Sequence, residues 1–171
     1  MGRPVYLTLN PPAHPLHPRT PAVNQTPASD DSSPVPRRRR GVVAVVLRRE
    51  RLLVIRRSAL VVAAGAYCFP GGGIEGEETE PAALIREIQE ELGLDIVPLR
   101  RLWQSVTPWQ VELAWWLVRL PGGAEPVPNP AEVATCDWYT PAAMRRLPGL
   151  LESNLAFLDA LAAGEFCLDP A

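Results

Sequence analysis

Residues 80–92 have the length of a helix and an unusual density of glutamate. Thr79 precedes them as an N-cap candidate, and Pro81 is tolerated in the first turn of a helix. Gly93 stands where a C-terminal glycine is typical. These boundary residues predict a helix over residues 80–92.

The predicted helix carries its carboxylates beside its apolar face. At about 100° per residue, one stripe contains Pro81, Leu84, Ile85, Ile88 and Leu92, and we expect it to face the core. Glu87 and Glu91 stack on the flank of this stripe, and Glu90 lies one step further round. Solvated helices relieve such repulsion with basic residues four positions away, but only Arg86 is available. The acidic edge therefore calls for another source of positive charge.

The loop before this helix contains Gly71, Gly72 and Gly73 and adds further glutamates. Glycine lets backbone amides and carbonyls approach an ion or a phosphate closely. Mg²⁺ prefers oxygen ligands and binds through a few carboxylates together with substrate phosphates. The pattern therefore favours a divalent cation site at this loop and helix.

The other segments alternate between strand and helix patterns. β-branched runs on both sides of residues 48–50 predict a hairpin, and residues 66–69 predict a short strand that ends at Pro70. Further predicted strands are 96–106, 111–120 and 132–139, and further predicted helices begin at Thr140 and cover 152–163. This order indicates an α/β or α+β class with a mixed sheet.

Residues 1–40 are rich in proline and end in four arginines. Their composition predicts a disordered tail, followed by a single globular domain over residues 41–171. From Gly41 on, 11 arginines stand against 17 acidic residues. Such an acidic body is a poor nonspecific nucleic-acid binder, so we expect no nucleic-acid partner.

Two absences narrow the chemistry. The chain has no lysine, which excludes Schiff-base catalysis and a P-loop lysine. Both histidines, His14 and His17, lie in the predicted tail, so a histidine-based triad or zinc site is not expected in the body. An enzyme built from this sequence must use carboxylates, arginines, backbone amides and a bound ion.

The segment from Gly72 to Leu94 resembles the Nudix box. Gly72 is followed after five residues by Glu78 and after seven more by Arg86-Glu87-Ile88-Gln89-Glu90-Glu91-Leu92-Gly93-Leu94. The chain is therefore identified as a member of the Nudix hydrolase family, which is MutT-like. One departure is that Glu77 stands directly before Glu78, where family members commonly have glycine.

The resemblance implies an α/β/α sandwich around a mixed sheet and Mg²⁺- or Mn²⁺-dependent hydrolysis of a nucleotide diphosphate bond. Glu90 and Glu91 match the main metal ligands, and Glu87 matches a further ligand or a carboxylate that orients water. Arg86 matches the arginine that keeps the glutamates in register.

Four residues are expected to bind substrate or its phosphates: Gly71, Gly72, Arg56 and Glu78. Arg56 ends a predicted strand near the site, where it either binds phosphate or pairs with surface acids, and Arg57 shares this alternative.

A general base must come from a carboxylate. Glu132 follows a loop rich in proline and precedes a strand that bears Trp138, a layout found in many Nudix sequences. Glu112 is the alternative, on a strand that contains two tryptophans. We expect Glu132 to act as the base.

The substrate remains open between a nucleoside diphosphate linked to another group and a nucleoside triphosphate. The alternative function is a nucleotide-sensing regulator with the same fold and no turnover. No apolar run approaches the roughly 18 residues needed to span a bilayer, so we expect no membrane partner. The start of the chain lacks a secretory signal pattern, and three widely spaced cysteines suggest a reducing compartment. We therefore expect a cytoplasmic location, with a homodimer as one open assembly state.

Overall fold

A computed structural model describes residues 38–169 of the 171-residue chain. The elements in chain order are β1 Arg39–Arg48, β2 Arg51–Arg57, β3 Tyr67–Cys68, β4 Gly71–Gly73, α1 Glu80–Leu92, β5 Val97–Val106, β6 Val111–Arg119, the 3-10 turn η1 Pro121–Gly123, β7 Val133–Tyr139, α2 Pro141–Met144 and α3 Glu152–Ala162. The tail prediction for residues 1–37 lies outside the described residues. β1 begins at Arg39, two residues before the predicted start of the domain at Gly41. The division of the chain into a tail and one domain stays a prediction.

The strands form one mixed sheet in the order β3-β2-β1-β6-β5. β1 is its central strand: it runs parallel to β6 and antiparallel to β4 along its first half, and it forms a hairpin with β2 at its end. β7 pairs antiparallel with β2. β1 therefore joins the glycine strand β4 to the half of the sheet that carries β2 and β7.

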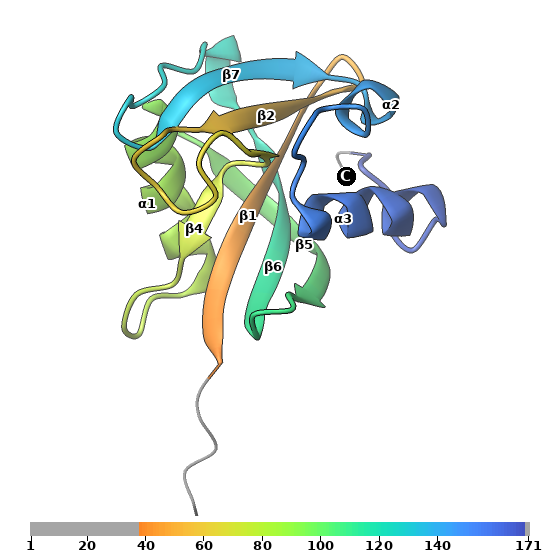
Figure 1. Cartoon of the computed structure of the whole chain (residues 1–171), viewed down its shortest axis with the longest axis horizontal. Coiled ribbons are helices and arrows are strands. Elements are labelled where there is room, and N and C mark those ends of the chain that lie inside the picture. The colour runs from red at the N-terminus through yellow and green to blue at the C-terminus, as the bar shows by residue number, and fades with distance from the viewer. Residues whose placement is uncertain (1–37, 170–171) are drawn as a thin grey trace, which may run out of the picture. The chain divides into compact units, whose positions relative to one another are not determined.

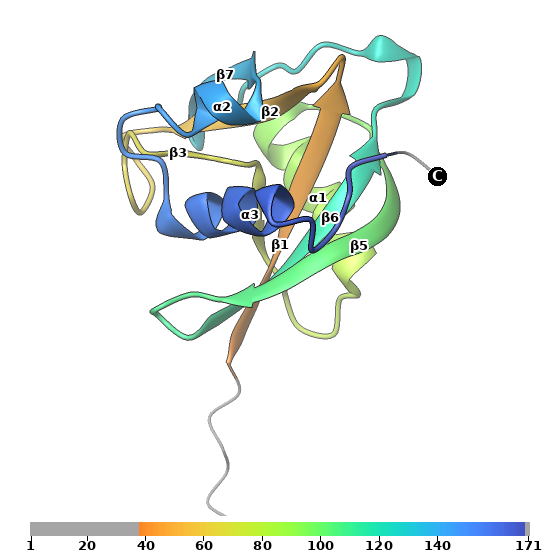
Figure 2. The same cartoon turned by 90° about the vertical axis from the view of Figure 1, so that its right-hand side faces the viewer.

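Helices cover both faces of this sheet, with α1 on one side and α3 on the other (Figures 1 and 2). Leu84, Ile88 and Leu92 of α1 pack against one face. On the other face, Phe157 of α3 stacks on Trp115 with ring centroids 4.6 Å apart. The structure thus confirms the predicted α/β/α sandwich around a mixed sheet.

Helix α1 has the predicted bounds. The Thr79 hydroxyl accepts a hydrogen bond from the Ala82 N–H, and Gly93 ends the helix in the left-handed conformation. The predicted core stripe is wrong at Ile85, whose exposed fraction is 43%, while Ala83, Glu87 and Glu91 are buried instead. The helix is rotated so that its carboxylate flank faces the sheet.

Two features of the strands bear on the predictions. The hairpin is confirmed, and its turn residues Arg49 and Glu50 both have positive φ. Gly71–Gly73, predicted as part of the loop before the helix, form the strand β4, which pairs with Gly41–Val43 of β1. A Cβ atom on Gly71 would overlap the Val42 carbonyl oxygen, so the close pairing depends on glycine.

None of the helices among residues 38–169 is long and apolar enough to cross a bilayer.

Candidate active site

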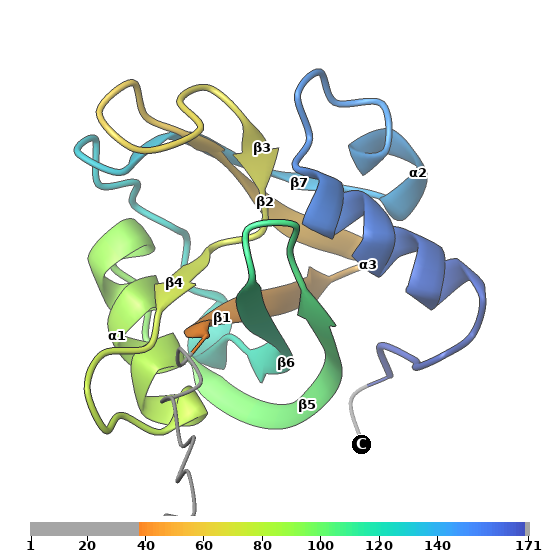
Figure 3. The same ribbon diagram turned by 60° about the horizontal axis from the view of Figure 1, so that its bottom comes forward.

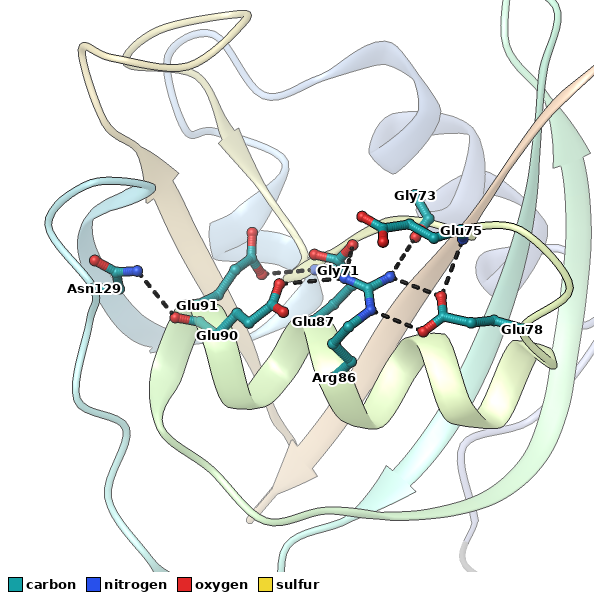
Figure 4. Close-up of polar contacts among 9 residues, drawn as sticks. All are labelled: Gly71, Gly73, Glu75, Glu78, Arg86, Glu87, Glu90, Glu91 and Asn129. Atoms are coloured by element: carbon teal, nitrogen blue, oxygen red, sulfur yellow. Dashed lines mark hydrogen bonds and ion pairs between the residues drawn. The ribbon is translucent and has the colours of Figure 1, made fainter.

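Glu87 and Glu91 project from α1 toward β4 (Figure 4). Their exposed fractions are only 8% and 4%, which is unusual for glutamate. The Gly71 N–H donates a hydrogen bond of 2.8 Å to the Glu91 Oε2. The Glu87 carboxylate lies against Gly72, where any Cβ atom would overlap it. The glycine strand is therefore the wall against which both carboxylates are packed.

Arg86 links four parts of the site (Figure 4). Its guanidinium donates to both carboxylate oxygens of Glu78 at 2.9 Å, to Glu87 at 2.9 Å and to Glu90 at 3.2 Å. It also donates to the Gly73 carbonyl oxygen at 2.9 Å. One arginine thus holds three glutamates and the end of β4 in a fixed arrangement, and Glu78 belongs to this network.

The environment raises the pKa of Glu87 and Glu91 and lowers that of Glu78. Burial raises the pKa of the Glu91 carboxyl to about 8, although the Gly71 hydrogen bond lowers it. Burial also raises the pKa of Glu87, partly offset by the hydrogen bond from Arg86. Hydrogen bonds from Arg86, and then from the Glu75 N–H, lower the pKa of Glu78 to about 2. Arg86 therefore compensates Glu78 fully and Glu87 in part, whereas Glu91 accepts its hydrogen bond from a neutral backbone amide.

We expect the metal-free protein to lose stability as pH rises from about 5 to 8. An unfolded glutamate titrates near pH 4.3, whereas folded Glu91 titrates near 8. Between these values the folded state holds the extra proton. The free energy of unfolding therefore falls with pH, approaching a slope of about 1.4 kcal/mol per pH unit. The stabilising contribution is complete below pH 4.3 and is lost through pH 8.

Denaturant unfolding in chelator at several pH values measures this slope. Glu91→Gln carries no titrating group and should flatten the dependence between pH 5 and 8. A variant with the wild-type slope would show that Glu91 ionises normally in the folded protein.

Glu132 directly precedes β7, in the segment that follows Asn129. Burial is the main cause of the raised pKa of Glu87 and Glu91, and the negative charge of Glu132 adds to it. Its backbone is fixed, because the Glu132 carbonyl accepts from the Ser58 N–H at 2.8 Å and its N–H donates to the Asn129 carbonyl. The structure thus ties the backbone of Glu132 to the residue after β2 and to Asn129.

The segment before Glu132 is held by the end of α1. The last carbonyls of a helix lack partners within it. Here the Leu92 carbonyl accepts from the Val127 N–H, and the Glu91 carbonyl from the Asn129 N–H, both at 2.8 Å. The Asn129 side chain donates to the Glu90 carbonyl at 3.2 Å (Figure 4). These bonds place the start of β7 next to the glutamates.

Glu112 lies elsewhere. It accepts a hydrogen bond from Gln104 and lines a separate small cavity together with Arg40, Glu80 and Arg101. Glu80 is already paired with both arginines in this second cluster. Glu112 therefore belongs to a polar network near the start of α1 and is not in the Glu91 cluster.

A cavity of about 390 Å³ adjoins the glycine strand. It is bordered by residues of β1, β3, β4 and β6 and by the first turn of α3, where Asn154 accepts a hydrogen bond from the Phe69 N–H. In Figure 3, β4 lies beside α1. A molecule in the cavity would therefore contact the same glycine strand that supports the carboxylates.

The two adjacent arginines of β2 point to different surroundings. Arg56, the predicted phosphate ligand, donates to the Gly65 carbonyl and lies over the Tyr67 ring. Arg57 lines the cavity and lies near Glu91. Strand alternation in the sequence indicates this difference between the two arginines. Leu53 and Ile55 pack on the α1 side of the sheet, and Arg57 is the next residue in that alternating series.

The donor atoms suit a hard divalent cation, because Glu87, Glu90 and Glu91 offer only oxygen. Among residues 38–169, no three Asp, Glu, His or Cys side chains are already gathered around one point. Arg86 pairs with Glu87 at 2.9 Å and with Glu90 at 3.2 Å. The Glu90 side chain is 49% exposed, so it is free to turn. The three glutamates fit such an ion if Glu87 and Glu90 give up their ion pairs with Arg86 and bind the ion in its place.

Comparison with known proteins identifies relatives of this chain. The family model described as NUDIX domain matches residues 37–161. No curated protein sequence matches the chain. Among solved structures, a MutT NUDIX hydrolase from Burkholderia pseudomallei is 26% identical, with a TM-score of 0.55, and the match covers 71% of this chain and 95% of that one.

Two further structures share the fold. An ADP-ribose pyrophosphatase from Streptococcus suis is 23% identical with a TM-score of 0.56, and the match covers 72% of this chain and 92% of that one. A MutT protein from Methanosarcina mazei is 19% identical with a TM-score of 0.59, covering 70% and 88%.

Proposed function

The chain belongs to the NUDIX family of hydrolases, and from this membership we propose that it cleaves a diphosphate bond with the help of Mg²⁺ or Mn²⁺. The substrate is a small nucleotide, either a nucleoside diphosphate linked to another group or a nucleoside triphosphate. The observation that carries the proposal is the pair of buried carboxylates, Glu87 and Glu91, packed on a glycine strand with Glu90 and a single arginine, Arg86, beside them.

Glu87, Glu90 and Glu91 are the residues we assign to metal binding. When bound, a divalent cation neutralises the diphosphate, lowers the pKa of a coordinated water and stabilises the leaving phosphate. Glu90 and Glu91 supply the main ligands, and Glu87 either adds a ligand or orients the attacking water. Burial of Glu91 supports this assignment, because a buried carboxylate gains most from a nearby cation.

Arg86 acts as the organising residue of the site. Its ion pairs with Glu78, Glu87 and Glu90 keep the glutamates in place before the cation binds. Gly71 and Gly72 allow phosphate groups to approach the backbone, since neither presents a side chain. Glu78 acts with Arg86 at the edge of the phosphate site.

Glu132 accepts the proton of the attacking water in this proposal. It comes from a segment that is separate from the metal-binding helix and hydrogen-bonded to the end of that helix, which supports this role. The Asn129 and Ser58 bonds hold it there without a moving loop.

A coupled phosphate-release screen tests the proposal, because cleavage of these bonds yields nucleoside monophosphates, other phosphomonoesters or pyrophosphate. Alkaline phosphatase releases phosphate from the products of the diphosphate derivatives, and inorganic pyrophosphatase releases it from the product of the triphosphates. The full chain is incubated with nucleoside diphosphate sugars, dinucleoside diphosphates and nucleoside triphosphates, in Mg²⁺, in Mn²⁺ and in chelator. We expect metal-dependent release from at least one class and none in chelator. The alternative, a nucleotide-sensing regulator, predicts nucleotide binding without release from any class. The complete set from Arg86 to Glu91 favours the enzyme.

Gly72→Ala is expected to lower kcat by about 10- to 100-fold, because a misplacement of about 1 Å at a catalytic group has effects of this size. The new methyl group would displace the Glu87 carboxylate from its seat. Gly73→Ala is the matched control, since a Cβ atom there meets nothing within 4 Å. Steady-state kinetics of both variants measure the difference. Equal rates for the two would indicate that the position of Glu87 on Gly72 is irrelevant to turnover.

A further inference from the structure

A second cavity, of about 320 Å³, lies at the other end of the central strands. The first cavity touches β1 at residues 39–43, where β4 pairs with it, whereas the second touches the last residues of β1 and β6. Its volume is within the usual range for small-molecule sites, about 300–1,000 Å³. This cavity is therefore a candidate binding site apart from the glutamates of α1.

Aliphatic side chains form most of the wall of the second cavity. Val46, Leu117 and Val118 line it and are buried. Leu99 stands at its rim with an exposed fraction of 39%. Leu168 lines it from the segment after α3, which Figure 2 shows running beside β5. Aliphatic side chains normally pack without leaving voids larger than a water molecule, so an open apolar space between several segments favours an apolar ligand.

Arg48 gives this cavity a cationic border. Its guanidinium lies over the Trp138 ring, 4.3 Å from the centroid, and both residues line the cavity. The guanidinium donates to the Ala124 carbonyl at 2.8 Å and to the Glu125 carboxylate at 2.7 Å. Arg119 is the other charged residue that lines the cavity. The border is therefore positive and favours a ligand with an anionic group.

The Glu125 carboxylate shows which anionic group fits Arg48. The Glu125 side chain is 73% exposed, and exposed ion pairs of this kind contribute little to stability. The carboxylate of a ligand can therefore take its place, because a guanidinium binds carboxylates through parallel N–H donors. A ligand that also fills the apolar space gains from both contacts, whereas Glu125 gains only from the ion pair.

We propose that this cavity binds an aliphatic carboxylate, with the carboxylate on Arg48 in place of Glu125 and the chain among the leucines. The site is separate from the proposed active site, and its occupation does not depend on turnover. Burial of the chain contributes about 4-fold in affinity per methylene, and charge-assisted hydrogen bonds to Arg48 add to it. The affinity should therefore depend on both the length of the chain and the charge of the ligand.

Calorimetry on the full chain tests the site with octanoate as the probe. Octanoate should bind, and hexanoate should bind about 10- to 20-fold more weakly because it lacks two methylenes. Octanamide should bind about 10- to 100-fold more weakly, because it lacks the charge that Arg48 recognises. Arg48→Gln should weaken octanoate binding by a similar factor. Arg51→Gln is the matched control: Arg51 donates to the Trp138 carbonyl from outside the cavity, and its loss should change the affinity less than about 3-fold.

Glu125→Gln should act in the opposite direction, because the competing carboxylate is removed. We expect octanoate to bind about 3-fold more tightly, in keeping with the loss of one exposed ion pair. Opposite effects of the Arg48 and Glu125 variants identify exchange at Arg48, since a general loss of stability would weaken binding in both. If Arg48→Gln lowers the melting temperature by many degrees, Glu125→Gln decides: tighter binding supports the site, and unchanged binding contradicts it.

Several outcomes would overturn the inference. They are equal binding of octanoate and octanamide, a loss in Arg51→Gln as large as that in Arg48→Gln, and no binding at millimolar octanoate. If octanoate binds only after Pro170 and Ala171 are removed, the end of the chain fills the cavity and no ligand is needed. If octanoate binding competes with self-association, a second copy of the chain covers the cavity instead. Either result also contradicts a ligand site.

Discussion

Glu90→Gln and Glu91→Gln are each expected to lower kcat by at least about 100-fold, through lost charge stabilisation and lost activation of water. Each change replaces a carboxylate with an amide of the same shape, so packing on β4 is retained. The Gly71 N–H can still donate to the amide oxygen at position 91. The loss of rate would therefore report charge and metal binding and would leave the fold intact.

The two variants should differ in metal-free stability. Glu91 is 4% exposed and its pKa is raised by burial, so a neutral amide removes a destabilised charge. The Glu90 side chain is half exposed and pairs with Arg86, so its neutralisation should change little. In chelator, Glu91→Gln should unfold at an equal or higher temperature than the wild-type chain at pH 8, and Glu90→Gln close to it.

Glu77→Gln is the control for both. It lies in the loop before α1 and is exposed, so its kinetics should match the wild-type chain. Kinetics in Mg²⁺, in Mn²⁺ and in chelator, followed by phosphate release, complete the test. Full turnover in chelator, or unchanged kinetics in both box variants, would contradict the metal assignment.

Local signals explain which parts of the fold could be predicted. The bounds of α1 follow from Thr79 and Gly93, whose capping geometry depends only on neighbouring residues. The predicted orientation of α1 was wrong at Ile85 because the prediction considered only the spacing of apolar residues. A glycine strand beneath the helix admits Glu87 and Glu91, and no periodicity within the helix reports that strand.

Long-range pairing explains what could not be predicted. β4 is a strand because Gly41–Val43 of β1 pairs with it, 30 residues away. The choice between Arg56 and Arg57 depends on which face of β2 meets α1, which the sequence indicates only through alternation. The segment of Glu132 is held near α1 because β7 pairs with β2 and because Asn129 binds the Glu90 and Glu91 carbonyls. The number of residues between the box and Glu132 does not indicate that these segments lie near each other.

Glu132→Gln is expected to lower kcat by about 100-fold or more, within the usual range for loss of a general base, with a smaller change in KM. The box carboxylates are poor bases once they bind a cation, because the cation lowers their pKa. Glu132 is free of that role, and no histidine or lysine lies in residues 41–171 to take its place. The bonds from Ser58 and Asn129 fix its backbone, so the amide should occupy the position of the carboxylate.

Glu112→Gln and Glu125→Gln are the matched controls. Glu112 lies in the separate polar network with Gln104, and Glu125 forms an exposed ion pair with Arg48 at 2.7 Å. Both should retain kcat within a few-fold, since an exposed pair contributes little even to stability, about 0–1 kcal/mol. A pH–rate profile gives a second readout, because loss of the base should abolish the acidic limb of kcat. If Glu112→Gln is the crippling change and Glu132→Gln is nearly silent, the base lies on β6 and the proton follows a route through the Gln104 network.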